Sequence, residues 1–309
     1  MMIGRIVCAV WPFGEPEDVI KNTMNTNSII GYDQFRRLKR VLPEVKIEFF
    51  DKATEYDSSD VLLIMSSVYV IPIEVLRSFK KVVYFYDDVG VIKAQSEQFS
   101  VHLDQVGLVL HPEPSQVSSL NSFWTKPTHY MPWSSASVST EANAIVKRRS
   151  IFVDINPYPF AAQSVEFGAN FIRSLRDMDV ELFVPAAAIH LLPEDVSNSI
   201  REVPRMPHQE FLEFIGGMMF YASGIYSSYE YIVMEAALLG CGLISLYGAV
   251  LPVHRNRACV LDYKGEDGIS DKISEAISTF DQANIIATSK LLYPLDAVSK
   301  IPAILEATF

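Results

Sequence analysis

Cysteine and basic residues are scarce in this chain, and each scarcity excludes a class of protein. The 309 residues include three cysteines, Cys8, Cys241 and Cys259, which lie far apart and form no C-x-x-C pair. This usage argues against a disulfide framework and favours a reducing compartment, so we expect a cytoplasmic protein with buried thiols. The formal net charge of −11 repels a phosphate backbone, and we therefore expect no nucleic-acid partner.

Several catalytic and metal-binding signatures are also missing. The sequence contains no phosphate-binding G-x-x-x-x-G-K-[ST], no G-x-S-x-G and no G-x-G-x-x-G, and its six histidines show no metal-ligand spacing. His111 and His208 fall where loops should face a ligand, but a lone histidine is more often structural. Asp177-x-Asp179 matches the D-x-D metal motif of a different transferase fold, yet it precedes a strand instead of following one. We therefore expect neither a metal nor a cofactor.

An uninterrupted membrane-spanning run is absent as well. The longest apolar stretch, Ile232 to Val253, contains Glu235 and is interrupted by Gly240, Gly242 and Gly248. A buried helix followed by a buried strand explains this stretch better than a membrane span. A peripheral membrane contact is compatible with the sequence.

What the chain does contain is a repeated alternation of strand and helix patterns. In the first half, strands are expected at 3–10, 45–50, 61–65, 82–86 and 107–110, with helices at 28–41 and 72–79. In the second half, strands are expected at 151–155, 180–184, 200–203, 218–222, 243–246 and 258–261, with helices at 163–176, 193–199, 209–215, 229–239 and 267–280. This order predicts an α/β protein with two Rossmann-like domains facing a central cleft, residues 1–140 and 141–309, joined by a linker near 133–149.

The most informative segment runs from Ser227 to Ser245. Ser228 is a good N-cap for the predicted helix, and Gly240 suits the left-handed position after its end. Glu235 falls mid-helix among apolar neighbours, where a carboxylate needs a partner. A ribose diol would serve, and so would a core arginine or lysine. The helix N-terminus would favour an anionic diphosphate.

This segment resembles the donor-site helix of GT-B glycosyltransferases, especially the large retaining class. The resemblance implies that Glu235 binds the ribose of a nucleotide. Ser227 occupies the place of the earlier glutamate in the usual E-x7-E pattern, and Glu230 is offset from it by three positions. Ser227, Ser228, Tyr229 and Glu230 are therefore candidate donor-binding residues alongside Glu235.

Other segments extend the resemblance over roughly residues 150–280. The run from Val203 to Phe211, with Arg205 and Pro207, is similar to the loop that touches the nucleotide base. The ending, Ala297 to Phe309, is similar to the helix that packs back on the N-terminal domain.

In the first half, Gly31 falls near the place where many relatives have a glycine loop at the donor phosphates. Asp87 and Asp88 end a strand that should point into the cleft. Either carboxylate could act as a general base or hold a sugar hydroxyl, and strand-end solvation explains the pair equally well.

Besides Ser227, the chain departs from the pattern of this glycosyltransferase class in a second respect. The arginine and lysine that normally follow the first strand of the C-terminal domain are replaced by the run from Val153 to Pro159. Their loss would weaken stabilisation of the leaving group. Four arginines are candidates to substitute, and each also reads as an ordinary surface residue: Arg201, Arg205, Arg255 and Arg257.

The resemblance thus implies a metal-independent glycosyltransferase. Its donor is a nucleoside diphosphate sugar, and its acceptor is a saccharide, a lipid-linked molecule or another small molecule. Two alternatives stay open: a nucleotide-sugar epimerase of the same fold, and a non-catalytic subunit that binds a nucleotide sugar. The sequence leaves the sugar, the base and the stereochemical outcome undetermined.

Overall fold

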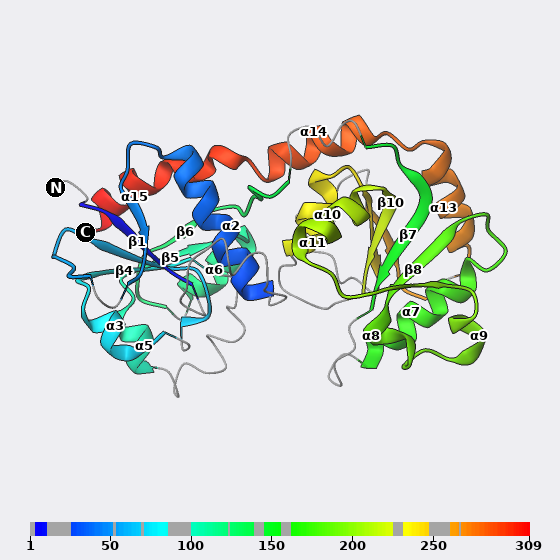
Figure 1. The fold of residues 1–309 in the computed structure, drawn as a ribbon, viewed down its shortest axis with the longest axis horizontal. Helices are drawn as coiled ribbons and strands as arrows, with labels where there is room; N and C mark the ends of the chain where they lie inside the picture. Colours follow the sequence, from blue (N-terminus) through cyan, green and yellow to red (C-terminus); the bar gives the residue numbers. More distant parts are fainter. Residues whose placement is uncertain are drawn as a thin grey trace. The chain divides into compact units, whose positions relative to one another are not determined.

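The computed structural model describes residues 4–10, 26–51, 54–68, 71–85, 100–122, 124–138, 145–155, 162–224, 231–246, 260–265 and 267–309. The chain divides into two compact units, one formed by Met1–Ser137 with Tyr293–Phe309 and the other by Val138–Leu292. Each unit is built on a six-stranded sheet with helices on it (Figure 1). The observed division falls a few residues before the expected one at 140. The last segment, from residue 293, belongs to the first unit.

The first unit contains a parallel sheet. Its strands are β1 (Ile6–Ala9), β2 (Ile47–Phe49), β3 (Val61–Ile64), β4 (Lys81–Phe85), β5 (Leu108–His111) and β6 (Thr128–Tyr130). Its helices are α2 (Thr26–Val41), α3 (Ile73–Arg77), α5 (Ser100–Gln105), α6 (Pro114–Asn121), the 3-10 helix η4 (Leu295–Lys300) and α15 (Ile301–Thr308). The spatial order is β2-β1-β3-β4-β5-β6, with every pair parallel. The strand order therefore reverses between β1 and β3.

Apolar side chains on both faces explain why these strands read as continuous hydrophobic runs. On one face, Val7, Leu62 and Val82 pack in a core with Leu76 of α3 and Leu120 of α6. The α2 helix brings aromatic side chains to the sheet. Their rings lie against Phe49 of β2, with centroid distances of 5.1 Å for Tyr32 and 3.8 Å for Phe35.

A buried arginine on α2 organises the part of the first unit where the chain leaves and returns. Arg37 is fully buried, and its guanidinium donates to the carbonyl oxygens of Pro132 (2.9 Å), Pro294 (2.6 Å) and Leu295 (2.8 Å). It also donates to the side-chain oxygen of Gln34 at 3.0 Å. One side chain therefore ties both the segment before residue 137 and the segment after 293 to one helix.

Neighbouring side chains strengthen the same attachment. The Gln34 amide donates to the carbonyl oxygen of Ser134 at 2.6 Å, and the Ser134 hydroxyl donates to the carbonyl oxygen of Tyr293 at 2.9 Å. The Ser137 hydroxyl donates to Asp33 at 2.6 Å. The two crossing segments are thus held by side chains of α2 and by each other.

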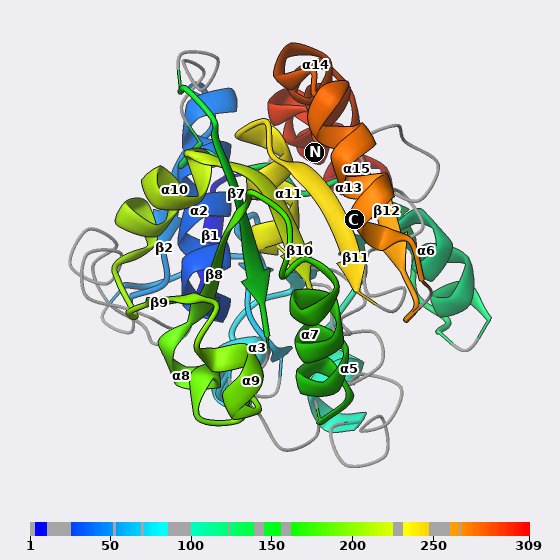
Figure 2. The same cartoon turned by 90° about the vertical axis from the view of Figure 1, so that its right-hand side faces the viewer.

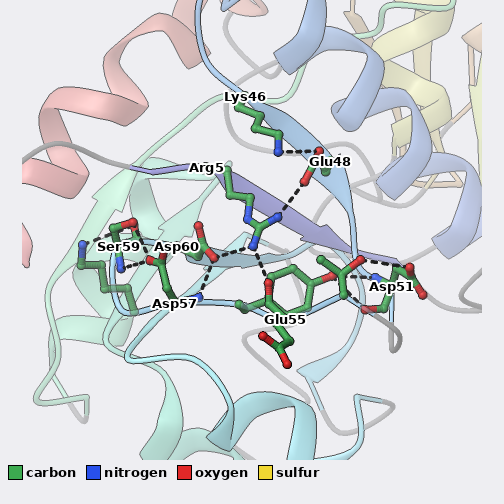
Figure 3. Close-up of polar contacts among 11 residues, drawn as sticks. Arg5, Lys46, Glu48, Asp51, Glu55, Asp57, Ser59 and Asp60 are labelled. Carbon is green, nitrogen blue, oxygen red and sulfur yellow. Dashed lines mark hydrogen bonds and ion pairs between the residues drawn. The ribbon is translucent and has the colours of Figure 1, made fainter.

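A polar network occupies the opposite, amino edge of the same sheet (Figure 3). Arg5, which precedes β1, pairs with Glu48 of β2 at 3.2 Å and with Asp60, directly before β3, at 3.0 Å. It also donates to the carbonyl oxygen of Glu55 at 2.6 Å. Because ligands of parallel sheets bind at the carboxyl ends of the strands, this network serves the fold.

The second unit repeats the parallel architecture with a different order. Its strands are β7 (Arg148–Asp154), β8 (Glu181–Pro185), β9 (Arg201–Val203), β10 (Met218–Ser223), β11 (Gly242–Leu246) and β12 (Val260–Tyr263). Its helices are α7 (Ala162–Ser174), α8 (Ala186–Ile189), α9 (Glu194–Ser197), α10 (His208–Gly216), α11 (Tyr231–Leu238), α13 (Ile269–Ser278) and α14 (Gln282–Leu292). The order β12-β11-β10-β7-β8-β9 is that of the Rossmann dinucleotide-binding fold, with its switch point between β7 and β10.

Helices cover both faces of this second sheet, with α7 and α13 on the same face (Figure 2). On that face, Ile151 and Val153 of β7 pack against Phe171 and Ile172 of α7 and Ile273 of α13. On the other face, residues of β7 and β10 pack against α10 and α11: Phe152, Tyr221, Leu212, Ile215, Val233, Ala236 and Ala237. The alternation of side chains along β7 thus supplies two cores.

The basic run at 147–149 is not part of a linker. Arg148 and Arg149 begin β7, and Lys147 lies against the ends of two helices. The Lys147 ammonium donates to the carbonyl oxygens of Gly216 (2.8 Å) and Leu239 (2.9 Å), and it lies 3.4 Å from the Cys241 sulfur. Burial lowers the pKa of Lys147. The expectation that the linker extends to residue 149 was therefore wrong.

The α/β class and most strands agree with the sequence prediction. The described part of the long apolar stretch, residues 232–246, is a buried helix and a buried strand, joined at Gly240 with φ of 80°. Helices α5, α6, α8 and α14 were not predicted. In α6 the reason is Pro114, which occupies the first helical position, where proline is well tolerated. Among the described residues, no helix combines the length and apolar character needed to cross a bilayer.

Candidate donor-binding site in the second unit

The carboxyl edge of the second sheet carries polar side chains at its switch point. Asp154 ends β7, and the Tyr221 hydroxyl of β10 donates a hydrogen bond to its carboxylate. Directly after β10, the amide of Gly224 donates to the carbonyl oxygen of Asp154 at 2.9 Å. A Cβ atom at Gly224 would lie only 2.8 Å from that oxygen, so a glycine is needed for this close approach.

Polar residues continue from Asp154 across three neighbouring strands. Asp154 is in register with Ser223 of β10, Ser223 with Ser245 of β11, and Ser245 with Asp262 of β12. Residues in register on parallel strands point to one face, which here is the face covered by α10 and α11. Burial raises the pKa of Asp154 to about 6, and the Tyr221 hydrogen bond opposes this rise. Carboxylate and hydroxyl groups therefore line this edge of the sheet, where the glycosyltransferases that the sequence resembles normally have an arginine and a lysine.

Glu235 lies in α11, the helix that follows β10. Its side chain is fully buried, and every residue of α11 apart from Ile232 is buried with it. The helix packs through Val233, Ala236 and Ala237 into the core on that face. An acidic residue at such a position is held there only by specific polar contacts.

One of these contacts comes from the start of the neighbouring helix. The Nε2 atom of His208 lies 3.1 Å from Oε1 of Glu235, and the exposed fraction of the His208 side chain is 10%. His208 is the first residue of α10, and Pro207 stands at the N-cap with φ of −54° and ψ of 149°. The contact joins the turn between β9 and α10 to the middle of α11.

The remaining donor-site candidates are distributed as follows. Arg205 is exposed in the turn between β9 and α10, the turn that carries Pro207. Gly31 lies within α2, and a Cβ there would meet the Met65 carbonyl oxygen and a Val10 methyl, both at 2.6 Å. It thus allows α2 to pack closely on the ends of β1 and β3, and its role toward a donor phosphate stays a prediction.

Several expected site residues lie outside the described part of the chain. They are Asp87, Asp88, Ser227, Ser228, Tyr229 and Glu230, together with Arg255 and Arg257. Within the described part, His, Cys, Asp and Glu side chains form no group of three or more that could hold a metal ion. Asp179 is 96% exposed and pairs with Arg149 at 3.5 Å.

Comparison with known proteins shows which fold these two units form. No protein-family model and no curated protein matches the sequence. Among solved structures, AviGT4, a glycosyltransferase involved in avilamycin A biosynthesis, aligns with a TM-score of 0.63 at 10% identity over 98% of this chain and 97% of its own. The chain has the GT-B fold.

Two further structures with this fold align over most of their length. Anabaena HepE, solved in complex with UDP and glucose, gives a TM-score of 0.58 at 10% identity and covers all of both chains. Sucrose-phosphate synthase from Thermosynechococcus elongatus gives 0.58 at 13% identity over 80% of this chain and 73% of its own. The expected α/β class, the two Rossmann-like units and the GT-B fold are confirmed.

Two features of the site were not recognised from the sequence. His208 was treated as a structural histidine, and the structure places it against Glu235. Asp154 was noted only as part of the run that lacks cations, and the structure joins it to Tyr221 at the switch point. The sequence signal that could have drawn attention to His208 is the Pro207-His208 pair at the start of a helix. No local signal links Asp154 to Tyr221, because strand order decides their proximity.

Proposed function

We propose that this protein is a glycosyltransferase that uses a nucleoside diphosphate sugar as donor and binds the donor ribose through Glu235. The observation that carries the proposal is a buried carboxylate, held by His208, on the helix that follows the switch-point strand of a GT-B fold. Carboxylate oxygens accept hydrogen bonds from vicinal hydroxyls, which is how such a group would hold a ribose. Because Glu235 has no exposed surface, donor binding must displace the groups that cover it.

The first experiment identifies the donor. A thermal-shift panel of UDP-, GDP-, ADP- and CMP-sugars should show one that raises the melting temperature, since a ligand that binds the folded state stabilises it by mass action. UDP-sugars come first, because HepE was solved with UDP and with UDP-glucose.

The second experiment tests Glu235 itself. Titration calorimetry with the identified nucleotide should show that Glu235→Gln weakens binding by roughly tenfold or more, the equivalent of one hydrogen bond to a charged group. The matched control is Glu210→Gln, a change to an exposed glutamate on α10, which should leave the affinity unchanged. Equal affinities of the wild type and Glu235→Gln would refute the assignment.

The proposal includes metal independence. A metal-free transferase relies on protein groups to stabilise the leaving diphosphate. Sugar transfer should therefore persist in the presence of a chelator. Loss of activity with chelator and recovery with magnesium or manganese would overturn this part.

Product analysis distinguishes the alternative activities. Transfer to a saccharide, a lipid-linked or another small acceptor identifies a transferase, and conversion of the sugar on the nucleotide identifies an epimerase. Binding without turnover would instead identify a non-catalytic subunit. The residues in register with Asp154 at this edge of the sheet include no cation that could stabilise a leaving diphosphate. This is why the assay for binding without turnover is needed.

A further inference from the structure

His208 and Glu235 are brought together by two helices that share one core. His208 begins α10, which packs through Leu212 and Ile215 into the core on one face of the second sheet. Glu235 belongs to α11, which packs through Val233 and Ala236 into the same core. Both ends of the 3.1 Å contact are therefore attached to packed helices. Its geometry is set by the fold and not by a mobile surface chain.

The contact has a defined chemical consequence for the carboxylate. A glutamate side chain ends in a torsion that is broad and roughly two-fold, so an unanchored carboxylate samples many orientations. A hydrogen bond from His208 Nε2 to Oε1 selects one of them. The direction in which the carboxylate can accept hydrogen bonds from a ligand is then fixed before the ligand arrives, which reduces the entropy lost on binding.

We infer that His208 is a positioning residue that orients the Glu235 carboxylate toward the ribose hydroxyls of the donor. This inference rests on the proposed function and adds to it a residue that touches Glu235 and not the ligand. Second residues of this kind, which hold a ligand-binding group by a hydrogen bond, typically change affinity by about 10- to 100-fold in metal sites. A similar range is expected here.

The test must separate positioning from a general structural role. It measures the affinities of a nucleoside diphosphate and its 2′-deoxy analogue for the wild type, Glu235→Gln and His208→Ala. If Glu235 binds the ribose diol, the wild type prefers the ribonucleotide, and Glu235→Gln loses that preference. If His208 acts through Glu235, the preference of His208→Ala for the ribonucleotide should be roughly tenfold smaller than that of the wild type. Its affinity for the deoxy analogue should stay near the wild-type value. A structural defect would weaken both ligands equally.

Two further variants sharpen the comparison. In the Glu235→Gln background, His208→Ala should have no additional effect on the preference, since the group it orients is already altered. His208→Gln, which can still supply an N–H donor, should recover part of the preference. His190→Ala, at an exposed histidine that ends α8, is the matched control and should behave as wild type.

The outcomes divide as follows. A wild-type preference in His208→Ala, together with its loss in Glu235→Gln, would overturn the positioning role and leave the proposed function standing. A wild type that binds none of the UDP-, GDP-, ADP- and CMP-sugars of the thermal-shift panel would overturn both the positioning role and the proposed function. Should His208→Ala fail to fold, His208→Phe keeps an aromatic ring without an N–H donor and decides the question. If neither variant folds, His208 is structural and the inference is wrong.

Discussion

Tyr221 and Asp154 are joined by a hydrogen bond across the two strands at which the strand order of the second unit reverses. The phenolic hydroxyl of β10 donates to the carboxylate that ends β7. Burial raises the pKa of Asp154 to about 6, and the hydrogen bond from Tyr221 lowers it in part. This acid therefore binds its proton more tightly in the folded protein than in the unfolded chain, where an aspartate has a pKa of about 3.9.

The first prediction is a pH dependence of stability that Asp154 contributes. Between about pH 4 and pH 6 the folded state holds the proton that the unfolded chain has released, so stability should fall as the pH rises through this window. The full shift corresponds to about 3 kcal/mol. Asp154→Asn keeps an acceptor for Tyr221 and cannot ionise, so this contribution should be absent from the variant.

The measurement is urea denaturation of the wild type and Asp154→Asn at pH 4.5 and pH 7.5. Contributions from other carboxylates cancel in the difference between the two proteins. The variant should gain stability relative to the wild type at the higher pH. A difference that is the same at both pH values would show that Asp154 titrates normally.

The second prediction concerns the buried guanidinium of the first unit. Arg37→Met removes donors to three carbonyl oxygens and leaves one of these acceptors buried and two partly buried, so the free energy of unfolding should fall by about 3 kcal/mol or more. Arg36→Met is the matched control on the same helix. Arg36 is exposed and makes one long contact of 3.4 Å with Ser137, so its loss should cost about 0.5 kcal/mol or less. Denaturation that is equally sensitive to both changes would contradict the role of Arg37.

The third prediction concerns Lys147. Its ammonium group lies at the carboxyl ends of two helices, α10 and α11, where a cation bonds the last carbonyl oxygens and complements the helix dipoles. Lys147→Met should lower the free energy of unfolding by about 1–3 kcal/mol. Arg149→Met breaks only an exposed ion pair with Asp179 and should have little effect. Chemical denaturation of both variants checks this. An unchanged free energy of unfolding in Lys147→Met would show that water replaces the contact.

The fourth prediction tests the close packing of α2. Alanine is the better helix former by about 1 kcal/mol, but the Cβ of Gly31→Ala would lie 2.6 Å from the backbone oxygen of Met65. Because the backbone of a central strand yields little, the clash should prevail, with a net loss of about 1–3 kcal/mol. In Gly217→Ala the nearest atom is 3.4 Å away and φ is −82°, so that variant should be as stable as the wild type. A thermal melt in which Gly31→Ala is stabilised would show that α2 can shift.

Much of the architecture follows from local sequence patterns, because they reflect forces that act between near neighbours. Continuous apolar runs such as Val61 to Met65 predict buried parallel strands, and the observed strand occupies Val61–Ile64. Gly240 has the left-handed conformation that its place after a helix predicted. Glu235 was recognised as exceptional because an ionisable residue interrupts an apolar helix, and the structure places it fully buried.

The partners of these residues were decided by the tertiary structure alone. His208 meets Glu235 because α10 and α11 pack on one face of the sheet, and Tyr221 meets Asp154 because β10 lies beside β7. Arg37 reaches Pro294 and Leu295 because the end of the chain returns to the first unit. Hydrophobic periodicity indicates which face of an element is buried, but it does not indicate which other element will pack on that face. Strand order and helix packing supply that information, since they depend on the collapse of the whole chain.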